Sequence, residues 1–395
     1  MLNHLHRYHV VARSALVLSA VLITLGVGRG PAVLASPGPR AQATQPVAVI
    51  VGALPIAHAA GPPRYVVALV NGTGRVVARV MASVPPMLSV ASPGGVGGAL
   101  ATPLPPVTIS GSRVYYLDDG AALVRSLTPS GTVAAVTHVP GGTTAHVAIA
   151  VTPDDQRIAI GVVSYSVFTR NGTPTGNDMI AATTRIYVQD LRGGGSAPIF
   201  SLASRTVAEW PVGWVNGRVV VAVSAPGTQH GSSNPYNAFY GYHVASATTG
   251  QRLATLCASN PTTRAAPSAV GPLVPGGTLC LRADRWYLDT WDGSGRLLPG
   301  FAPTPYSAAA LAPDGHTLAW DSAGRVIIQR GGGQPTTTGV AGTPLGWIDV
   351  RHLVVAMGGP SGDTAAVLDT RAGTLKRTGV AATTLTMFGL LPNAL

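Results

Sequence analysis

Two kinds of turn alternate along most of this chain, and no other sequence feature constrains the fold as strongly. The first kind is a short polar turn followed by a β-branched or apolar run. It occurs as TPDD (152–155) before RIAIGVV, as APDG (312–315) before HTLAW and as VPGG (274–277) before TLCLR. Proline sets φ early in such a turn, and Asp and Gly tolerate its left-handed position. Each stretch therefore predicts a tight β-hairpin.

The second kind of turn contains Gly ahead of a basic or apolar residue. It occurs at VNGTGRVV (70–77), TPSGTV (128–133), QDLRGGGSAPIF (189–200), ATTGQRL (247–253), WDGSGRLL (291–298), DSAGRVI (321–327) and DTRAGTL (369–375). Turns of the first kind recur near residues 111, 154, 216, 276, 314 and 350, so the two kinds alternate. Four-stranded units that repeat at the spacing of these turns predict an all-β fold of the β-propeller type. A β-sandwich or a pair of barrels is the alternative, but neither requires this alternation.

The repeats number six complete units and one partial unit at the start. The partial unit holds VAVIVGAL (47–54) and the hairpin at 65–80, and it lacks an innermost strand. TTLTMFGLL (383–391) resembles the innermost strands of other units, so we expect it to complete the first blade and close the ring. Closure removes the free edges that an open array would expose. Seven blades are favoured, with six or eight as alternatives because the Pro/Gly-rich stretch 84–106 is hard to place.

Charged residues make up only 10% of the chain, with a single Glu (Glu209) and a single Lys (Lys376). Long soluble helices rely on both residue types, so this composition favours strands and turns. The formal net charge is +11, carried almost entirely by Arg residues that are spaced singly. Nucleic-acid binding requires a basic patch or stripe, and this pattern argues against it.

The N-terminus is typical of an exported protein. Residues 1–13 carry Arg and His and no acid, Ser14 to Gly28 is an apolar run, and small residues follow up to Ala35. This pattern predicts a signal peptide at 1–35, with an uncleaved membrane anchor as the alternative. A flexible linker at 36–46 and a single propeller domain at 47–395 would follow. The expected location is secreted or otherwise extracytoplasmic, at the cell envelope.

The chain has two cysteines, Cys257 and Cys280, which are 23 residues apart. An even cysteine count in an oxidising compartment favours one disulfide, and two buried thiols are the alternative. Trp210, Trp214, Trp286, Trp320 and Trp347 all adjoin β-runs, so we expect them to pack within or between blades rather than to stack on a ligand.

The stretches TPDDQRIAI and APDGHTLAW resemble the PDG repeat of bacterial TolB-type and WD-like propellers. The resemblance extends over most of 105–380. It implies the propeller fold and no particular activity, since such propellers include binding scaffolds, docking modules and the regulatory halves of peptidases. The chain departs from these families in two ways: its one Trp-Asp dipeptide, Trp291-Asp292, opens an outer turn, and no N-terminal α/β partner domain is evident.

Motifs for catalysis or metal binding do not occur in the sequence. There is no H-E-x-x-H, G-x-S-x-G, P-loop or zinc-spaced Cys/His set. Asp118-Asp119 lies at a strand end before Gly120, where a hairpin turn explains the pair, and a calcium ligand pair is the less favoured alternative. We therefore assign no catalytic residue, no metal and no cofactor, and an enzymatic role is left open but not favoured.

Two segments are much longer than the other connections, 165–182 and 225–243. Each falls between the second and third strands of its unit, and the units are consecutive, so both segments should project from one face of the ring. Aromatic and amide side chains suit sugar or peptide recognition. The candidate ligand-binding residues are Tyr165, Phe168, Arg170, Asn177, Asp178, His230, Tyr236 and Phe239. Tyr240 and Tyr242 fit equally well as strand residues packed between blades.

These observations favour a non-catalytic binding or scaffolding module for protein or glycan partners at the cell envelope. We expect a monomer that binds no nucleic acid and contacts a membrane only through an uncleaved N-terminal segment. The alternative is a propeller-type hydrolase, lactonase or lyase with its site at the mouth of the central channel. His146, Asp178, His230 and His352 are the polar residues that such a site would draw upon.

Overall fold

The computed structural model describes most of the chain after residue 44. The described ranges are 45–54, 64–83, 88–90, 98–100, 107–118, 122–140, 145–168, 179–226, 239–257, 269–282, 285–298, 300–301, 309–392 and residue 395. Regular structure within these ranges consists of β-strands alone. No helix long and apolar enough to cross a membrane occurs among them.

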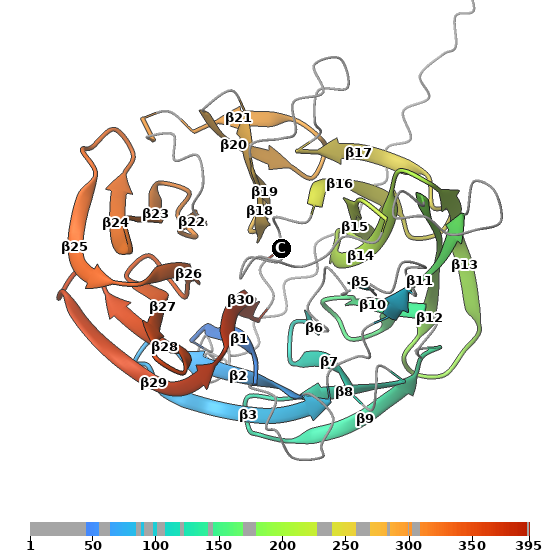
Figure 1. Cartoon of the computed structure of the whole chain (residues 1–395), viewed down its shortest axis with the longest axis horizontal. Helices are drawn as coiled ribbons and strands as arrows, with labels where there is room; N and C mark the ends of the chain where they lie inside the picture. Colours follow the sequence, from blue (N-terminus) through green and yellow to red (C-terminus); the bar gives the residue numbers. More distant parts are fainter. Residues whose placement is uncertain are drawn as a thin grey trace, which may run out of the picture. The chain divides into compact units, whose positions relative to one another are not determined.

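Seven four-stranded antiparallel sheets form the blades of a β-propeller (Figure 1). In every blade the strands are named from the innermost to the outermost. Blade 1 contains β30 (Thr384–Leu391), β1 (Val47–Ala53), β2 (Arg64–Asn71) and β3 (Val76–Ser83). Blade 2 contains β6 (Val107–Ile109), β7 (Val114–Asp118), β8 (Leu123–Leu127) and β9 (Val133–His138). Blade 3 contains β10 (Ala145–Val151), β11 (Arg157–Phe168), β12 (Met179–Asp190) and β13 (Ser196–Ser204).

The remaining four blades follow in chain order. Blade 4 contains β14 (Ala208–Val215), β15 (Arg218–Ser224), β16 (Phe239–Ser246) and β17 (Arg252–Leu256). Blade 5 contains β18 (Ala269–Val274), β19 (Gly277–Arg282), β20 (Arg285–Thr290) and β21 (Gly295–Leu297). Blade 6 contains β22 (Ala310–Leu311), β23 (Thr317–Ser322), β24 (Arg325–Arg330) and β25 (Thr336–Ala341). Blade 7 contains β26 (Thr343–Trp347), β27 (His352–Gly359), β28 (Gly362–Asp369) and β29 (Thr374–Ala382). A separate two-stranded sheet pairs β4 (Leu88–Val90) with β5 (Gly98–Leu100), inside the Pro/Gly-rich stretch that the sequence left unplaced.

The ring is closed by the last strand of the chain, as predicted. β30 pairs antiparallel with β1, so that Val47 lies opposite Leu391 and Ala53 opposite Thr384. The final strand thereby becomes the innermost strand of blade 1. The seven-blade count and the closure of the first blade are both confirmed.

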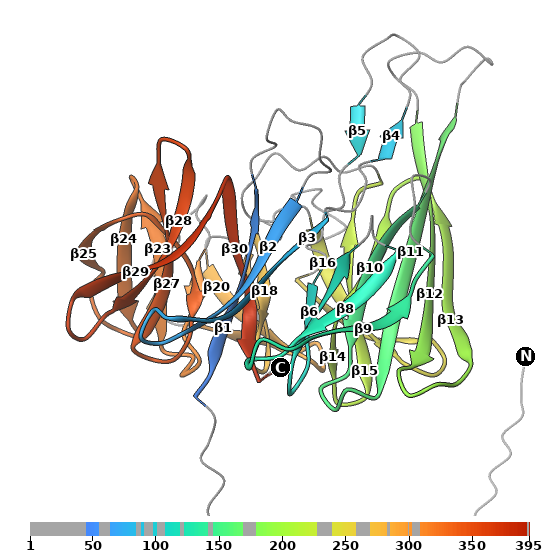
Figure 2. The same ribbon diagram turned by 90° about the horizontal axis from the view of Figure 1, so that it is seen from below.

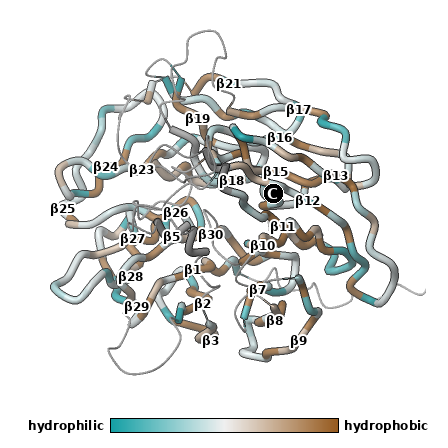
Figure 3. Tube along the Cα trace, turned by 45° about the vertical axis from the view of Figure 1, so that its right-hand side comes forward, coloured by the Kyte–Doolittle hydropathy of each residue, from teal (hydrophilic) through white to brown (hydrophobic). Residues whose placement is uncertain are grey.

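Hydrophobic packing between adjacent blades forms the core. Each of the seven interfaces between neighbouring blades holds a cluster of buried apolar residues from both partners. At the interface of blades 5 and 6, for example, Leu281 and Trp286 pack with Leu318 and Trp320. The inner strands β1, β10 and β11 are mostly hydrophobic (Figure 3), as expected for strands covered on both faces. Outermost strands such as β9 and β25 are largely exposed.

The tryptophans that the sequence assigned to packing are all buried. Trp210, Trp214, Trp286, Trp320 and Trp347 are between 0% and 3% exposed. A buried indole N–H needs an acceptor, and two of these residues find it in the preceding blade. Trp214 donates to the carbonyl oxygen of Ala150 at 2.6 Å, and Trp347 donates to that of Ala310 at 2.9 Å. These tryptophans therefore join adjacent blades by polar as well as apolar contacts.

The two ends of the ring carry different connections. Turns between the first and second strands, and between the third and fourth, lie at one end, which we call the turn face. Connections between the second and third strands, and from blade to blade, lie at the opposite end, which we call the loop face (Figure 2). The segments 169–178 and 227–238 each join a second strand to a third strand, in the consecutive blades 3 and 4. This placement matches the prediction. Both strands are longer than expected, since β11 ends at Phe168 and β12 begins at Met179.

One turn was assigned incorrectly from the sequence. DSAGRVI (321–327) was taken as an outer turn, but Ser322 pairs with Arg325, so this turn joins the second and third strands of blade 6. Ala323 and Gly324 both have positive φ, 52° and 73°, which is the backbone of a two-residue hairpin turn. The outer turn of that blade is GGGQP (331–335). Gly before a basic residue suits both kinds of connection, and the residue pattern alone does not separate them.

Blades 3 and 4 approach so closely at Gly161 that the position accepts no side chain. A Cβ there would overlap the ring of Pro211 in the neighbouring blade. We predict that Gly161→Ala lowers the free energy of unfolding by about 1–3 kcal/mol, because a rigid proline ring must be displaced. Urea denaturation followed by tryptophan fluorescence measures the change. Gly195→Ala is the matched control, since no atom lies within 4 Å of a Cβ at Gly195; an equal loss in both variants would refute the packing explanation.

Candidate functional site

Most of the residues predicted to bind a ligand fall outside the described part of the chain. These are Arg170, Asn177, Asp178, His230 and Tyr236. The backbone of Phe168 ends β11, where the segment 169–178 begins. The role of these residues in binding therefore stays a prediction.

The two remaining candidates lie at the base of the loop face, in an aromatic group shared by blades 3 and 4. The rings of Tyr165 and His146 are 5.8 Å apart, and those of His146 and Trp210 are 6.4 Å apart, both edge-to-face. Phe239 stacks edge-to-face with Tyr242 at 5.7 Å and is only 3% exposed. Tyr165 is half-buried, whereas Phe239 packs beneath the surface. The structure thus places Phe239 in a buried aromatic group, and its role in binding stays a prediction.

The two tyrosines that the sequence left open have different environments. Tyr242 is 1% exposed and donates its hydroxyl to the carbonyl oxygen of Gly271 in blade 5, at 2.8 Å. It is thus a packing residue between blades. Tyr240 is 43% exposed.

A depression opens at the mouth of the central channel, on the turn face. It encloses about 470 Å³, counting the space open to solvent. Its walls come from the innermost strands β18, β22, β26 and β30 and from the turns that follow the first two of them. The lining residues are Pro272, Leu273, Val274, Pro275, Ala310, Leu311, Pro313, Leu345, Gly346, Trp347, Met387, Phe388, Gly389 and Leu390. A channel mouth was the expected place of the alternative enzymatic site, but these residues were not predicted to form one, because they are scattered over more than a hundred positions.

The side chains that line the depression are apolar, and its polar lining atoms are those of the backbone and of the Trp347 indole. None of its fourteen lining residues carries an ionisable side chain, and its three prolines have no N–H to donate. The indole N–H of Trp347 is already bonded to the carbonyl oxygen of Ala310. A Cβ at Gly346 would lie 2.6 Å from the sulfur of Met387, so glycine keeps this wall open. Such a surface suits an apolar group and offers nothing for acid–base or nucleophilic chemistry.

Of the four polar residues named for an enzymatic site, the two that the structure describes, His146 and His352, do not meet at the channel mouth. His146 is 2% exposed and lies inside the aromatic group of blades 3 and 4. His352 lies at a turn of blade 7, where its Nδ1 is 2.7 Å from a carboxylate oxygen of Asp349. Asp178 and His230 lie outside the described residues. The two described histidines belong to different blades and form no common site.

The only glutamate of the chain lies in a buried polar group between blades 3 and 4. One carboxylate oxygen of Glu209 is 3.3 Å from Nε2 of His243, and the other accepts a 3.3 Å hydrogen bond from Arg252. The backbone N–H of Glu209 donates to the hydroxyl of Thr184 in blade 3. Burial raises the pKa of Glu209 to about 7, against the opposing effect of Arg252. Burial, with Arg252 acting in the same direction, lowers the pKa of His243.

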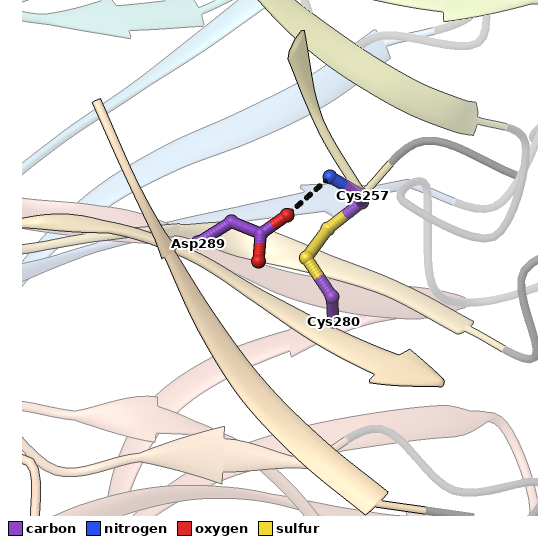
Figure 4. Close-up of side chains that lie close together, drawn as sticks. All are labelled: Cys257, Cys280 and Asp289. Atoms are coloured by element: carbon purple, nitrogen blue, oxygen red, sulfur yellow. Dashed lines mark hydrogen bonds between the residues drawn. A yellow bond between two sulfur atoms is a disulfide. The ribbon is translucent and has the colours of Figure 1, made fainter. Parts of the chain in front are cut away.

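A second buried polar group joins blades 4 and 5. Cys257 follows β17 and Cys280 lies in β19, and the two sulfurs are joined in a disulfide between the blades (Figure 4). The carboxylate of Asp289, in β20, lies beside them. These three side chains are the one group of potential metal ligands found among the described residues.

Comparisons with known proteins assign neither a family nor a function to this chain. No protein-family model matches the chain, and no curated protein matches it. Similar solved structures include dipeptidyl peptidase 4 from Porphyromonas gingivalis, with 10% identity and a TM-score of 0.44 over 82% of this chain and 50% of that one. TolB from Acinetobacter baumannii has 13% identity and a TM-score of 0.36, over 86% of this chain and 66% of that one.

An oligogalacturonate lyase in complex with manganese has 10% identity and a TM-score of 0.44, over 78% of this chain and 82% of that one. This chain spans half the length of the peptidase and about two thirds of TolB. The three proteins differ in activity, and the similarity is too low to transfer any of these activities. The class of this protein is thus defined by its own strand pairing, as a seven-bladed, four-stranded β-propeller.

We predict that Glu209 makes stability depend on pH near neutrality. An acid whose pKa is raised by folding stabilises the folded state below its unfolded pKa, and this stabilisation is lost as pH rises through about 7. Wild-type unfolding free energy should therefore fall by roughly 1–3 kcal/mol more than that of Glu209→Gln between pH 5 and pH 8. Urea titrations of both proteins at several pH values measure this difference. Asp292→Asn removes an exposed carboxylate as a control, and parallel pH profiles for wild type and Glu209→Gln would contradict the prediction.

Proposed function

We propose that this chain is an exported, non-catalytic β-propeller that binds a protein partner through the depression at its channel mouth. The observation that carries the proposal is the group of apolar side chains that the innermost strands of four blades contribute to this depression. The signal-peptide pattern at 1–35 and the disulfide between Cys257 and Cys280 support export. We further propose that the protein works as a monomer at the cell envelope.

The chemistry of the lining favours a protein over a glycan as the ligand. A bound sugar buries hydroxyl groups, and each needs a hydrogen-bonding partner. The side chains that line the depression offer no free hydrogen-bonding group, since the indole of Trp347 is already bonded, so a sugar would find only backbone groups there. An apolar side chain of a partner protein gains from burial in such a site and needs no polar partner.

The loop face is a second candidate surface. The strands that the segments 169–178 and 227–238 connect belong to consecutive blades, which share the aromatic group of His146, Tyr165 and Trp210. A rigid base of this kind is suited to holding recognition loops. Sugar or peptide binding by Arg170, Asn177, Asp178, His230 and Tyr236 remains a proposal for that face.

Binding of short peptides tests the channel-mouth proposal directly. Peptides selected from a random display library against the purified protein should contain apolar residues at fixed positions. Leu345→Arg places a charge in the depression, and we predict that it weakens the affinity of these peptides at least tenfold. Fluorescence anisotropy with labelled peptides measures the dissociation constants, and circular dichroism confirms that the variant is folded.

Leu253→Arg serves as the matched control, since Leu253 is an exposed leucine on the outermost strand β17. It should leave peptide affinity unchanged. Glycan-array binding that disappears on deletion of residues 228–237 would shift the function to the loop face. Turnover of ester, lactone or oligosaccharide substrates that Leu345→Arg abolishes would favour the enzyme alternative instead.

A further inference from the structure

The disulfide lies at the junction of two blades, beside a buried carboxylate. Cys257 is the first residue after the outermost strand of blade 4, and Cys280 lies on the second strand of blade 5. Asp289 lies on the third strand of blade 5. All three residues are 1% exposed. A chain segment leaving one blade is thus held to the next blade by a covalent bond and by the groups around it.

The carboxylate of Asp289 is held in place by neighbours on both blades. Its Oδ2 accepts a 2.8 Å hydrogen bond from the backbone N–H of Cys257 (Figure 4). The guanidinium of Arg282 contacts the same oxygen. Its Oδ1 has no hydrogen-bond partner in the described part of the chain. A buried carboxylate with unused acceptor capacity is costly, which makes this oxygen an unexplained feature of a structural disulfide site.

The three side chains have the composition of a metal site. Their ligand atoms, two sulfurs and one carboxylate oxygen, lie within 4.8 Å of one another. Zinc binds thiolate sulfur at about 2.3 Å and carboxylate oxygen at about 2.0–2.2 Å, in a tetrahedral arrangement. Ligand atoms around such an ion are roughly 3–4 Å apart. The cluster has this size, provided that the two sulfurs are no longer bonded to each other.

We propose that reduction of the Cys257–Cys280 disulfide converts this cluster into a binding site for a thiophilic divalent cation such as Zn²⁺. A dithiol reductant transfers two electrons and two protons to the disulfide, which yields two protein thiols and the oxidised, cyclic form of the reductant. The cation then binds the two sulfurs as thiolates, with release of both thiol protons, and takes one oxygen of Asp289. A water molecule completes the four-coordinate shell.

The charges around the three side chains favour replacement of the disulfide by a bound cation. Two thiolates and a carboxylate around a divalent cation leave a net charge of −1, and the guanidinium of Arg282 beside Asp289 offsets it. Paired thiolates select zinc-like ions over magnesium or calcium, which prefer oxygen ligands. In the reduced protein the ion connects blade 4 to blade 5 in place of the covalent bond. The junction would then be held by a disulfide under oxidising conditions and by a metal under reducing ones.

Cobalt(II) is the probe for this site, because a tetrahedral thiolate complex of this ion absorbs strongly in the near ultraviolet and visible ranges. The full-length protein is reduced with dithiothreitol, freed of reductant by anaerobic gel filtration and titrated with Co²⁺. We expect one ion per reduced chain, displaced by Zn²⁺, and no thiolate absorption from the oxidised protein. Asp289→Asn should weaken Co²⁺ binding at least tenfold. Asp292→Asn, which removes an exposed carboxylate three residues away, should leave the affinity unchanged.

Alkylation of the thiols provides a second measurement that does not depend on a variant. Zn²⁺ should slow iodoacetamide modification of Cys257 and Cys280 at least tenfold in the reduced wild-type protein, and this protection should disappear in urea. Folding of the reduced chain on addition of Zn²⁺, seen by circular dichroism, would also support the site. Absence of thiolate absorption, protection that persists in urea, or equal Co²⁺ affinity of a folded Asp289→Asn variant would each overturn the proposal.

Discussion

The pairing of β30 with β1 is the interaction on which the ring depends. In the described part of the chain no strand ladder runs from one blade to the next, so neighbouring blades are held mainly by side-chain packing. Because the last strand enters the first sheet, every blade has a neighbour on both faces and no blade is left with an exposed apolar face. Opening the ring at this point would expose the interface clusters on either side of blade 1, so closure stabilises contacts well beyond the two strands that make it.

Buried acids and histidines are concentrated in one part of this ring. Among the described residues, the buried acids and histidines are His146, Glu209, His243 and Asp289, all in blades 3 to 5. Other interfaces, such as that of blades 5 and 6, are built from leucine and tryptophan. Apolar packing is indifferent to pH and redox state, whereas a buried carboxylate or a disulfide is not. The junctions on both sides of blade 4 are therefore where the surroundings of the protein can alter how its blades are held together.

Turn chemistry explains how much of the fold could be predicted from the sequence. A hairpin such as TPDD (152–155) is specified by a few adjacent residues, so it can be predicted without any knowledge of the tertiary structure. The turn at 321–327 was assigned incorrectly because Ala323 and Gly324 form a tight turn whose sequence resembles that of an outer turn. The candidate site was predicted less well. The loop residues were chosen for their segment length, and the apolar depression on the opposite face was not foreseen, since Leu345 and Leu390 look like ordinary strand residues.

By itself the sequence determined the all-β class, the seven units, the closing strand and the burial of the tryptophans, because these follow from local turns and from short apolar runs. Tertiary structure decided the rest. The depression gathers β18, β22, β26 and β30, and Glu209 and Asp289 each make a hydrogen bond to a neighbouring blade, Glu209 through its backbone N–H. Such sites depend on the angle and spacing between blades. These arise from packing across the whole ring, so no single stretch of residues predicts them.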